Sequence, residues 1–172
     1  PFLRVTPGRA PLVAALGRMR PAKGFDVLLR AFGALASGRP ELRLRIAGQG
    51  PERERLEALA ADLGVRDRVE FPGFVRDVPA FLAEAGLFVM PSRWEGFGLA
   101  LLEALAAGVP CVASRVDSLP EVGGRFVRWL EPGDADGVCR GMREALGLPV
   151  SPERIGRQRR WARRFSAAAR AE

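Results

Sequence analysis

Residues 91–108, PSRWEGFGLALLEALAAG, contain the pattern that decides the fold. The apolar run at 87–90 immediately before them is typical of a buried strand, and the run that begins at Leu99 is typical of a helix. Only a loop with a proline and two glycines separates the two runs, so the helix begins just beyond the carboxyl end of the strand. This order predicts a strand–loop–helix unit of the kind that α/β proteins repeat.

Similar units extend in both directions from this stretch. We expect strands at residues 12–16, 42–46, 69–71, 87–90, 110–113 and 126–129. Helices are expected at residues 25–35, 52–63, 78–84, 99–106 and 135–146, followed by a last helix over 152–169. The alternation predicts an open, doubly wound parallel sheet of the Rossmann type. Ligands of such sheets bind in the crevice at the carboxyl ends of the strands.

The composition narrows the class of protein. The chain has 172 residues, 48% of them hydrophobic, with 27 Lys and Arg against 20 Asp and Glu, as expected of an ordered basic domain. It contains no His, which excludes histidine-dependent hydrolase triads and leaves carboxylates, cations and backbone dipoles for any chemistry. Cys111 and Cys139 form neither a disulfide framework nor a metal motif. We therefore expect no metal ligands.

The loop and helix start within residues 91–108 predict an anion site. Backbone N–H groups at the start of a helix have no partner inside the helix and attract phosphate. The residues that would supply them are Gly96, Phe97, Gly98 and Leu99. Glu95 and Glu103 flank this site, and a carboxylate can accept two hydrogens from one diol, as the hexose and ribose of a nucleotide sugar offer. Alternatively, both glutamates only stabilise the positive end of the helix dipole.

A second anion-binding element follows the first expected strand. Gly17 permits a tight exit from that strand, and Arg18 and Lys23 lie on either side of a turn that contains proline. Both cations can then face the crevice, where two phosphates need about two cations. Lys23 is the only lysine of the chain, and lysine offers the compact point charge that phosphate sites often use. A solvated loop is the alternative for these cations.

Together these segments resemble the C-terminal, donor-binding domain of the retaining GT-B glycosyltransferases of family 4. The resemblance rests on five segments in the family's order, which are GRMRPAKGFDVLLRAF (17–32), LRIAGQGPERERLEALA (44–60), VEFPGFV (69–75), PSRWEGFGLALLEALAAGVPCVAS (91–114) and LPEV (119–122). It covers nearly all of residues 11–150 and implies the C-terminal half of a GT-B fold. The sequence departs from the family pattern after Glu121, where RFVRWLEPGD replaces a glycine-rich loop and an apolar strand.

The resemblance also implies roles for the residues at matching positions. Arg18 and Lys23 would bind the donor diphosphate and stabilise its departure, and Glu95 would hold sugar hydroxyls near the reacting carbon. Glu103 would bind the ribose diol. Further roles fall to Gly17 and Gly48, which let the nucleotide approach the sheet, to Phe74 and Val75, whose backbone would read the base, and to the N–H groups of Gly96 to Leu99. No metal and no other cofactor is implied.

The implied activity is that of a hexosyltransferase with a nucleotide-diphosphate sugar as donor and a glycan or lipid as acceptor. We expect residues 1–10 to be the remnant of an interdomain linker and residues 11–150 to form the nucleotide-sugar domain. The family's acceptor site belongs to an N-terminal domain that would precede this chain, so the chain alone is expected to bind donor without turnover. A catalytically silent nucleotide-sugar module or a GT-B epimerase half is the alternative.

Residues 151–172 carry seven Arg and two Glu, and we expect them to form a basic C-terminal helix that crosses to the missing domain. Its apolar positions are Ile155, Trp161, Phe165 and Ala168. This apolar face packs on the protein or, alternatively, binds an anionic membrane surface. Nucleic acid is not an expected partner, because no recognition motif accompanies the basic charge. No apolar run reaches the roughly 20 residues that span a bilayer, so we expect a cytoplasmic protein, with peripheral membrane contact left open.

Overall fold

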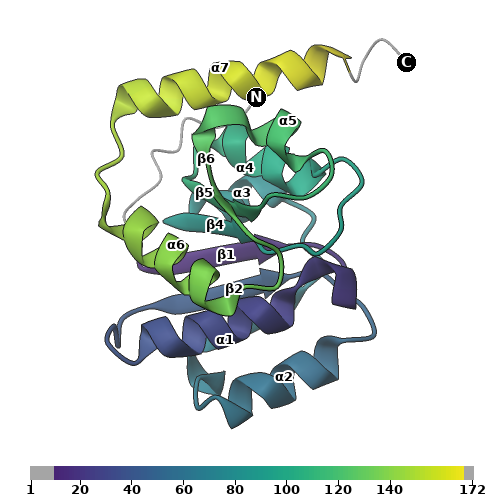
Figure 1. Ribbon diagram of the computed structural model, residues 1–172, viewed down its shortest axis with the longest axis vertical. Coiled ribbons are helices and arrows are strands. Elements are labelled where there is room, and N and C mark those ends of the chain that lie inside the picture. The colour runs from purple at the N-terminus through teal and green to yellow at the C-terminus, as the bar shows by residue number, and fades with distance from the viewer. Residues whose placement is uncertain (1–9, 169–172) are drawn as a thin grey trace.

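The computed structural model describes residues 10–168 and consists of one six-stranded sheet covered by helices on both faces (Figure 1). All described strand pairs are parallel, and the strand order is β3-β2-β1-β4-β5-β6. The strands are β1 (Leu12–Leu16), β2 (Arg43–Ala47), β3 (Val69–Gly73), β4 (Leu87–Met90), β5 (Cys111–Ser114) and β6 (Val127–Leu130). Strands β4 and β5 are buried at every position, which explains their uninterrupted apolar sequences.

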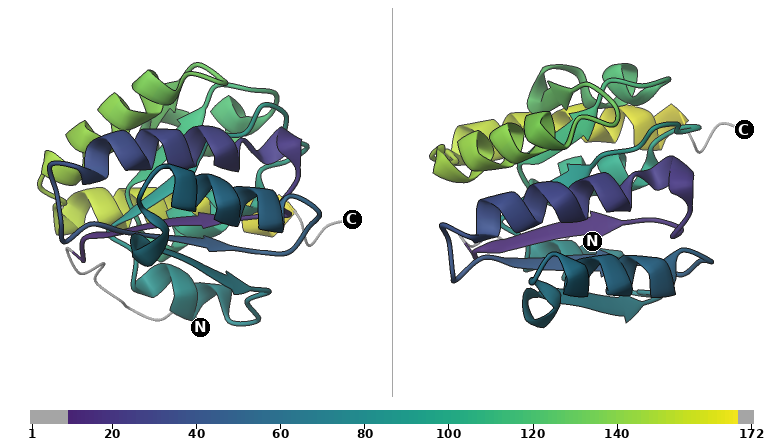
Figure 2. Two further views of the ribbon diagram at one scale, coloured as in Figure 1. Left: turned by 90° about the horizontal axis from the view of Figure 1, so that it is seen from below. Right: turned by 60° about the horizontal axis from the view of Figure 1, so that its bottom comes forward.

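Two sets of helices bury two separate apolar clusters against this sheet. On one face lie α1 (Phe25–Ala36), α2 (Arg53–Asp62) and α6 (Ala135–Gly147), which pack with Phe32, Leu44 and Val89. On the other face lie α3 (Val78–Ala83), α4 (Leu99–Ala107), α5 (Leu119–Gly123) and α7 (Pro152–Ala168). Figures 1 and 2 show the sheet between these two helix layers. The predicted open, doubly wound parallel sheet is therefore confirmed.

The predicted boundaries agree with the structure to within about two residues, but one α-helix and three 3₁₀ turns were not predicted. Strands β2, β5 and β6 each begin one residue later than expected, and β3 continues to Gly73 instead of ending at Phe71. The short helix α5 was not predicted, because five residues with Pro120 near the start show no helical period. Three 3₁₀ turns, η1 (Pro21–Lys23), η2 (Arg66–Arg68) and η3 (Gly124–Phe126), were also not predicted.

Helix α7 packs on α4, as the first of the two alternatives for its apolar face predicts. Ile155 and Ala162 are buried, and the Gln158 amide donates to the carbonyls of Leu105 and Val109, at 3.3 and 2.7 Å. The Trp161 indole donates to a carbonyl of α5 at 2.7 Å. Of the predicted apolar positions, Ile155 is thus buried against the body of the protein, and Trp161 and Phe165 are half-buried. The side chain of Ala168 and all of residues 169–172 lie outside the described part, as do residues 1–9 of the expected linker.

None of the helices that the structure describes combines the length and the apolar composition needed to cross a membrane.

Candidate active site at the β1–β4 switch point

The order of the strands places two loops opposite each other. In the sheet, β1 has β2 on one side and β4 on the other, so the chain winds outward in opposite directions from the position between β1 and β4. This position is the switch point of the fold, and a crevice opens there at the carboxyl ends of the two strands. The loops that line it are residues 17–24, after β1, and residues 91–98, after β4. The candidate anion-binding residues indicated by the sequence lie in these loops and at the start of α4, and the fold brings the loops together.

The two loops touch through their backbones. The N–H of Arg93 donates to the carbonyl of Ala22 at 2.8 Å. Gly24 has a φ of +66°, and a Cβ at this position would lie 2.1 Å from the carbonyl oxygen of Pro91. Only glycine combines this left-handed backbone with such a close approach. The contact fixes the distance between the two halves of the crevice.

Lys23 and Glu95 form an ion pair across this contact. The ammonium Nζ lies 2.5 Å from Glu95 Oε2, and the side chains are 22% and 11% exposed. The buried Ser92 hydroxyl lies 3.3 Å from the same carboxylate oxygen. The aliphatic part of Lys23 runs beside Gly17, whose ideal Cβ would lie 3.6 Å from Lys23 Cδ and Cε. Lys23 thus reaches from the exit of β1 to the loop after β4.

Arg93 and Asp26 clamp the outer side of the same contact. The guanidinium donates to both oxygens of Asp26 at 2.8 Å and to the Pro21 carbonyl at 2.8 Å. The hydrogen bond from Arg93, together with its charge, lowers the pKa of the Asp26 carboxyl below its ordinary value. Neither residue was singled out from the sequence. Their pairing is a consequence of the strand order, which no local pattern reveals.

A cleft of about 600 Å³ opens on the β2 and β3 side of this crevice. Its lining includes five of the residues that the sequence indicated, namely Gly17, Arg18, Gly48, Phe74 and Val75. Gly48 has a φ of +133°, and a Cβ there would lie 1.8 Å from the Gly17 carbonyl oxygen, so the loops after β1 and β2 meet only because this residue is glycine. Phe74 is 69% exposed. The cleft thus offers space for a ligand between the loop after β2 and the segment after β3.

The start of α4 offers backbone donors, as expected. Gly98 caps the helix in a left-handed conformation with a φ of +83°. The N–H groups of Gly96, Phe97, Gly98 and Leu99 have no hydrogen-bond partner among the residues that the structure describes. Phe97 and Leu99 are 49% and 61% exposed, although the Phe97 ring also contacts the Phe165 ring edge-on, with the ring centres 6.4 Å apart. The geometry of this turn is that of a helix N-terminus able to accept an anion.

Glu103 lies in the second turn of α4, half-buried in a stretch that is otherwise apolar. No cation or donor pairs with it in the described part of the chain. Burial raises the pKa of its carboxyl above the ordinary value. A partly desolvated carboxylate without a partner costs stability, which is not what the simple helix-dipole explanation predicts.

Asp117, which sequence analysis missed, holds the Glu95 loop in place. Its carboxylate accepts a hydrogen bond from the Glu95 N–H at 2.8 Å, and the neighbouring Ser118 hydroxyl donates to the Gly96 carbonyl at 2.6 Å. Asp117 has a φ of +46° and is the one non-glycine residue with positive φ among residues 10–168. Its location directly after β5, at the carboxyl edge of the sheet, was the available signal.

Comparison with protein families finds a match to the model described as glycosyl transferases group 1 over residues 4–161. Among curated relatives, the GDP-mannose-dependent alpha-(1-6)-phosphatidylinositol monomannoside mannosyltransferase of Mycolicibacterium smegmatis is 36% identical over 167 residues, which cover 90% of this chain and 44% of the relative. The lipopolysaccharide core biosynthesis glycosyltransferase LpsE of Rhizobium meliloti is 38% identical over 147 residues, 82% of this chain and 41% of the relative. The chain thus spans less than half of these relatives.

Solved structures with the same fold include WaaG, a glycosyltransferase involved in lipopolysaccharide biosynthesis, with a TM-score of 0.79 and 28% identity over 90% of this chain and 43% of WaaG. Anabaena HepE, solved with UDP and glucose, has a TM-score of 0.77 and 22% identity over 96% of this chain and 45% of HepE. The similarity to HepE concerns the fold alone.

Proposed function

Because the chain belongs to the glycosyl transferases group 1 family, we propose that it is the donor-binding half of a retaining GT-B hexosyltransferase of family 4. The donor is a nucleotide-diphosphate sugar of the UDP or GDP type, and the acceptor is a glycan or a lipid. The proposal is supported by the cleft at the switch point and by the mannosyl- and glycosyltransferase activities that the names of the relatives state.

In this proposal Arg18, Lys23 and the start of α4 hold the diphosphate. Arg18 lines the cleft, Lys23 reaches across the switch point, and the N–H groups of Gly96 to Leu99 have no hydrogen-bond partner in the described chain. The two cations balance two phosphate charges and stabilise the diphosphate as it leaves. We propose that this set replaces a metal ion.

In this proposal Glu95 and Glu103 each bind one sugar of the donor. Glu95 accepts hydroxyl hydrogens of the transferred hexose, and its negative charge next to the reacting carbon favours the positive charge that develops there. Glu103 accepts the two ribose hydroxyls, which supply the partners that its carboxylate lacks among the described residues. The base occupies the cleft beside Gly48, with the backbone of Phe74 and Val75 along its edge.

One observation carries the proposal furthest, namely the Lys23–Glu95 pair. The proposed phosphate-binding cation and the proposed sugar-binding carboxylate are in direct contact in this pair. In the donor, the sugar and the diphosphate are likewise bonded to each other, so one ligand can contact both side chains. A carboxylate that only stabilised the α4 dipole would not need a cation from another loop at 2.5 Å. The acceptor site belongs, in this proposal, to the part of the protein that the curated relatives have in addition.

The testing experiment is calorimetry of this chain with UDP, GDP, ADP and the corresponding nucleotide sugars. We expect weak binding of one nucleoside diphosphate, unchanged by EDTA. Glu103→Ala should weaken the nucleoside diphosphate and its sugar alike, whereas Glu95→Ala should weaken only the sugar-bearing ligand. A lost charge-assisted hydrogen bond of about 1.5–3 kcal/mol corresponds to roughly a 10- to 150-fold weaker affinity.

Two outcomes would contradict the proposal. If EDTA abolished binding, the cations and the helix start would not replace a metal. If both glutamate variants kept full affinity and lost only thermal stability, the carboxylates would be structural and the site would be wrongly assigned.

A further inference from the structure

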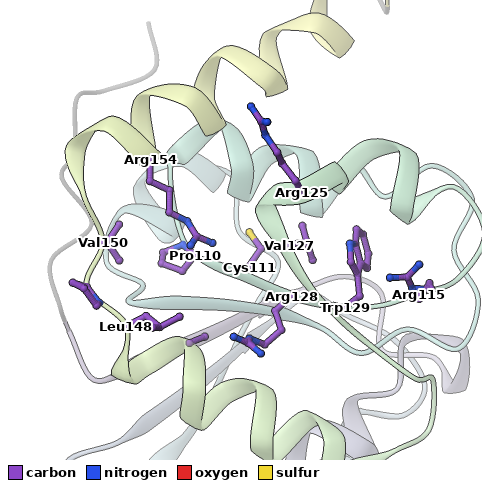
Figure 3. A pocket seen from close by; sticks show the side chains of 12 residues that line it. Pro110, Cys111, Arg115, Arg125, Val127, Arg128, Trp129, Leu148, Val150 and Arg154 are labelled. Atoms are coloured by element: carbon purple, nitrogen blue, oxygen red, sulfur yellow. The ribbon is translucent and has the colours of Figure 1, made fainter.

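A second cleft lies away from the switch point, along the edge strand β6. Its volume is about 470 Å³, which is within the range of small-molecule sites. Figure 3 shows Arg154 extending from the start of α7 toward Pro110 at one end, and Arg115 beside Trp129 at the other. Arg125 and Arg128 line the part between these ends. No residue of this lining also lines the donor cleft.

The charge of this cleft is of one sign. Four arginines line it and no Asp or Glu does. Arg128 forms an ion pair with Glu144 of α6, but Arg115, Arg125 and Arg154 pair with no carboxylate in the described part of the chain. Guanidinium groups that share a concave site repel one another, and such a site concentrates the electric field on a bound anion. Elsewhere Arg45, Arg53 and Arg93 are each neutralised by carboxylates.

The positive surface continues beyond Arg125. A more open hollow of about 340 Å³ on its far side is lined by Phe126 and Trp161 together with three arginines of α7, Arg157, Arg160 and Arg164. Arg125 is common to both hollows. The apolar side of α7 is used for packing on α4, so these arginines are on the side of the helix that remains outside. The two hollows form one basic region, which we call the β6 arginine cleft.

We propose that the β6 arginine cleft binds a ligand that carries two or more phosphate groups, at a site separate from the donor site. Guanidinium groups match phosphate oxygens with two parallel hydrogen bonds each. Arg154 and Arg115 lie at opposite ends of the cleft, and this arrangement favours a chain of phosphates over a single phosphate. Arg115 lies over the Trp129 ring, 6.0 Å from its centre, and is thereby held at its end of the cleft.

The experiment uses the chain with sodium tripolyphosphate as probe, in calorimetry with EDTA present. We expect two binding events, one at the donor site and one at the β6 arginine cleft. The double variant Arg125→Gln and Arg154→Gln should lose the second event, weakening it about tenfold for each arginine removed, and keep its affinity for nucleoside diphosphate. The matched control is Arg30→Gln with Arg39→Gln, which removes the same charge outside both clefts and should keep both events.

The outcomes separate this site from the donor site and from a membrane. Equal losses in the cleft variant and the control would mean diffuse charge attraction and would overturn the site. Loss of nucleoside diphosphate binding together with the second event would also overturn it, because the two sites would then be one. If wild-type protein ignored tripolyphosphate but floated with phosphatidylglycerol vesicles and not with phosphatidylcholine vesicles, the arginines would serve a bilayer surface and the polyphosphate site would be refuted.

Discussion

The ammonium group of Lys23 lies 2.5 Å from a carboxylate oxygen of Glu95, although 72 positions separate the two residues in the chain. The pair connects the loop after β1 with the loop after β4, and it lies where the two directions of winding meet. Both side chains are mostly buried, so each charge depends on the other more than in a surface ion pair. If this site binds the donor as proposed, a change in either residue should alter both ligand affinity and loop stability.

Lys23→Ala is expected to weaken nucleoside diphosphate binding about tenfold or more, because it removes the cation that pairs with Glu95 and runs beside Gly17 of the cleft. It should also lower Tm, since the Glu95 carboxylate loses its cation. Arg20→Ala is the control: Arg20 is exposed, lines neither cleft and should change neither quantity measurably. Equal losses of affinity in both variants, measured by calorimetry, would mean that Lys23 is a solvated loop residue with no specific role in binding.

The sequence predicted both members of this pair but not the contact between them. Lys23 was indicated by its loop and by being the only lysine, and Glu95 by the loop before α4. Their contact depends on β1 and β4 being neighbours in the sheet, which follows from the strand order and not from any local pattern. For the same reason the Arg93–Asp26 clamp could not be foreseen. Strand positions were predicted closely because buried parallel strands are short apolar runs.

Gly48→Ala is expected to reduce both stability and nucleoside diphosphate binding. The new Cβ would lie 1.8 Å from the Gly17 carbonyl oxygen, so the loops after β1 and β2 must move apart, and the positive φ adds further strain. We expect a loss of more than about 1 kcal/mol in the free energy of unfolding. Gly38→Ala is the matched control, because nothing lies within 4 Å of the position of its Cβ. Thermal unfolding and calorimetry of the two variants check the prediction, and equal effects would refute it.

Glu103→Gln is expected to raise Tm at neutral pH while weakening nucleoside diphosphate binding. Burial raises the pKa of Glu103, so the folded state holds its proton more tightly than the unfolded state. The carboxylate therefore costs no stability below the ordinary pKa of 4.5 and an increasing amount as the pH rises through the raised value. Melting curves of wild type and variant should coincide in acid and diverge toward neutral pH. A lower Tm of the variant at neutral pH would show that the charge has a stabilising partner.

The sequence did not reveal Asp117 either, because an isolated aspartate has no spacing that marks it. Its role follows from two tertiary facts, the hydrogen bond from the Glu95 N–H and the left-handed backbone. The helix α5, which was not predicted, begins two residues after it, at Leu119.

Three substitutions at Asp117 separate the effect of its hydrogen bond from the Glu95 N–H from the effect of its left-handed backbone. Asp117→Gly keeps the left-handed backbone and removes the acceptor, whereas Asp117→Asn keeps an acceptor oxygen in a residue that tolerates this conformation. Asp117→Ala removes the acceptor and strains the backbone.

If Asp117 positions Glu95, the glycine variant should bind the nucleotide sugar roughly tenfold more weakly, the effect of one hydrogen bond of about 1.4 kcal/mol, with little change for the nucleoside diphosphate. The asparagine variant should bind both ligands almost as wild type, and the alanine variant should in addition melt earlier than the glycine variant. If the glycine variant kept its affinity for the sugar-bearing ligand, the hydrogen bond to the Glu95 loop would have no part in donor binding.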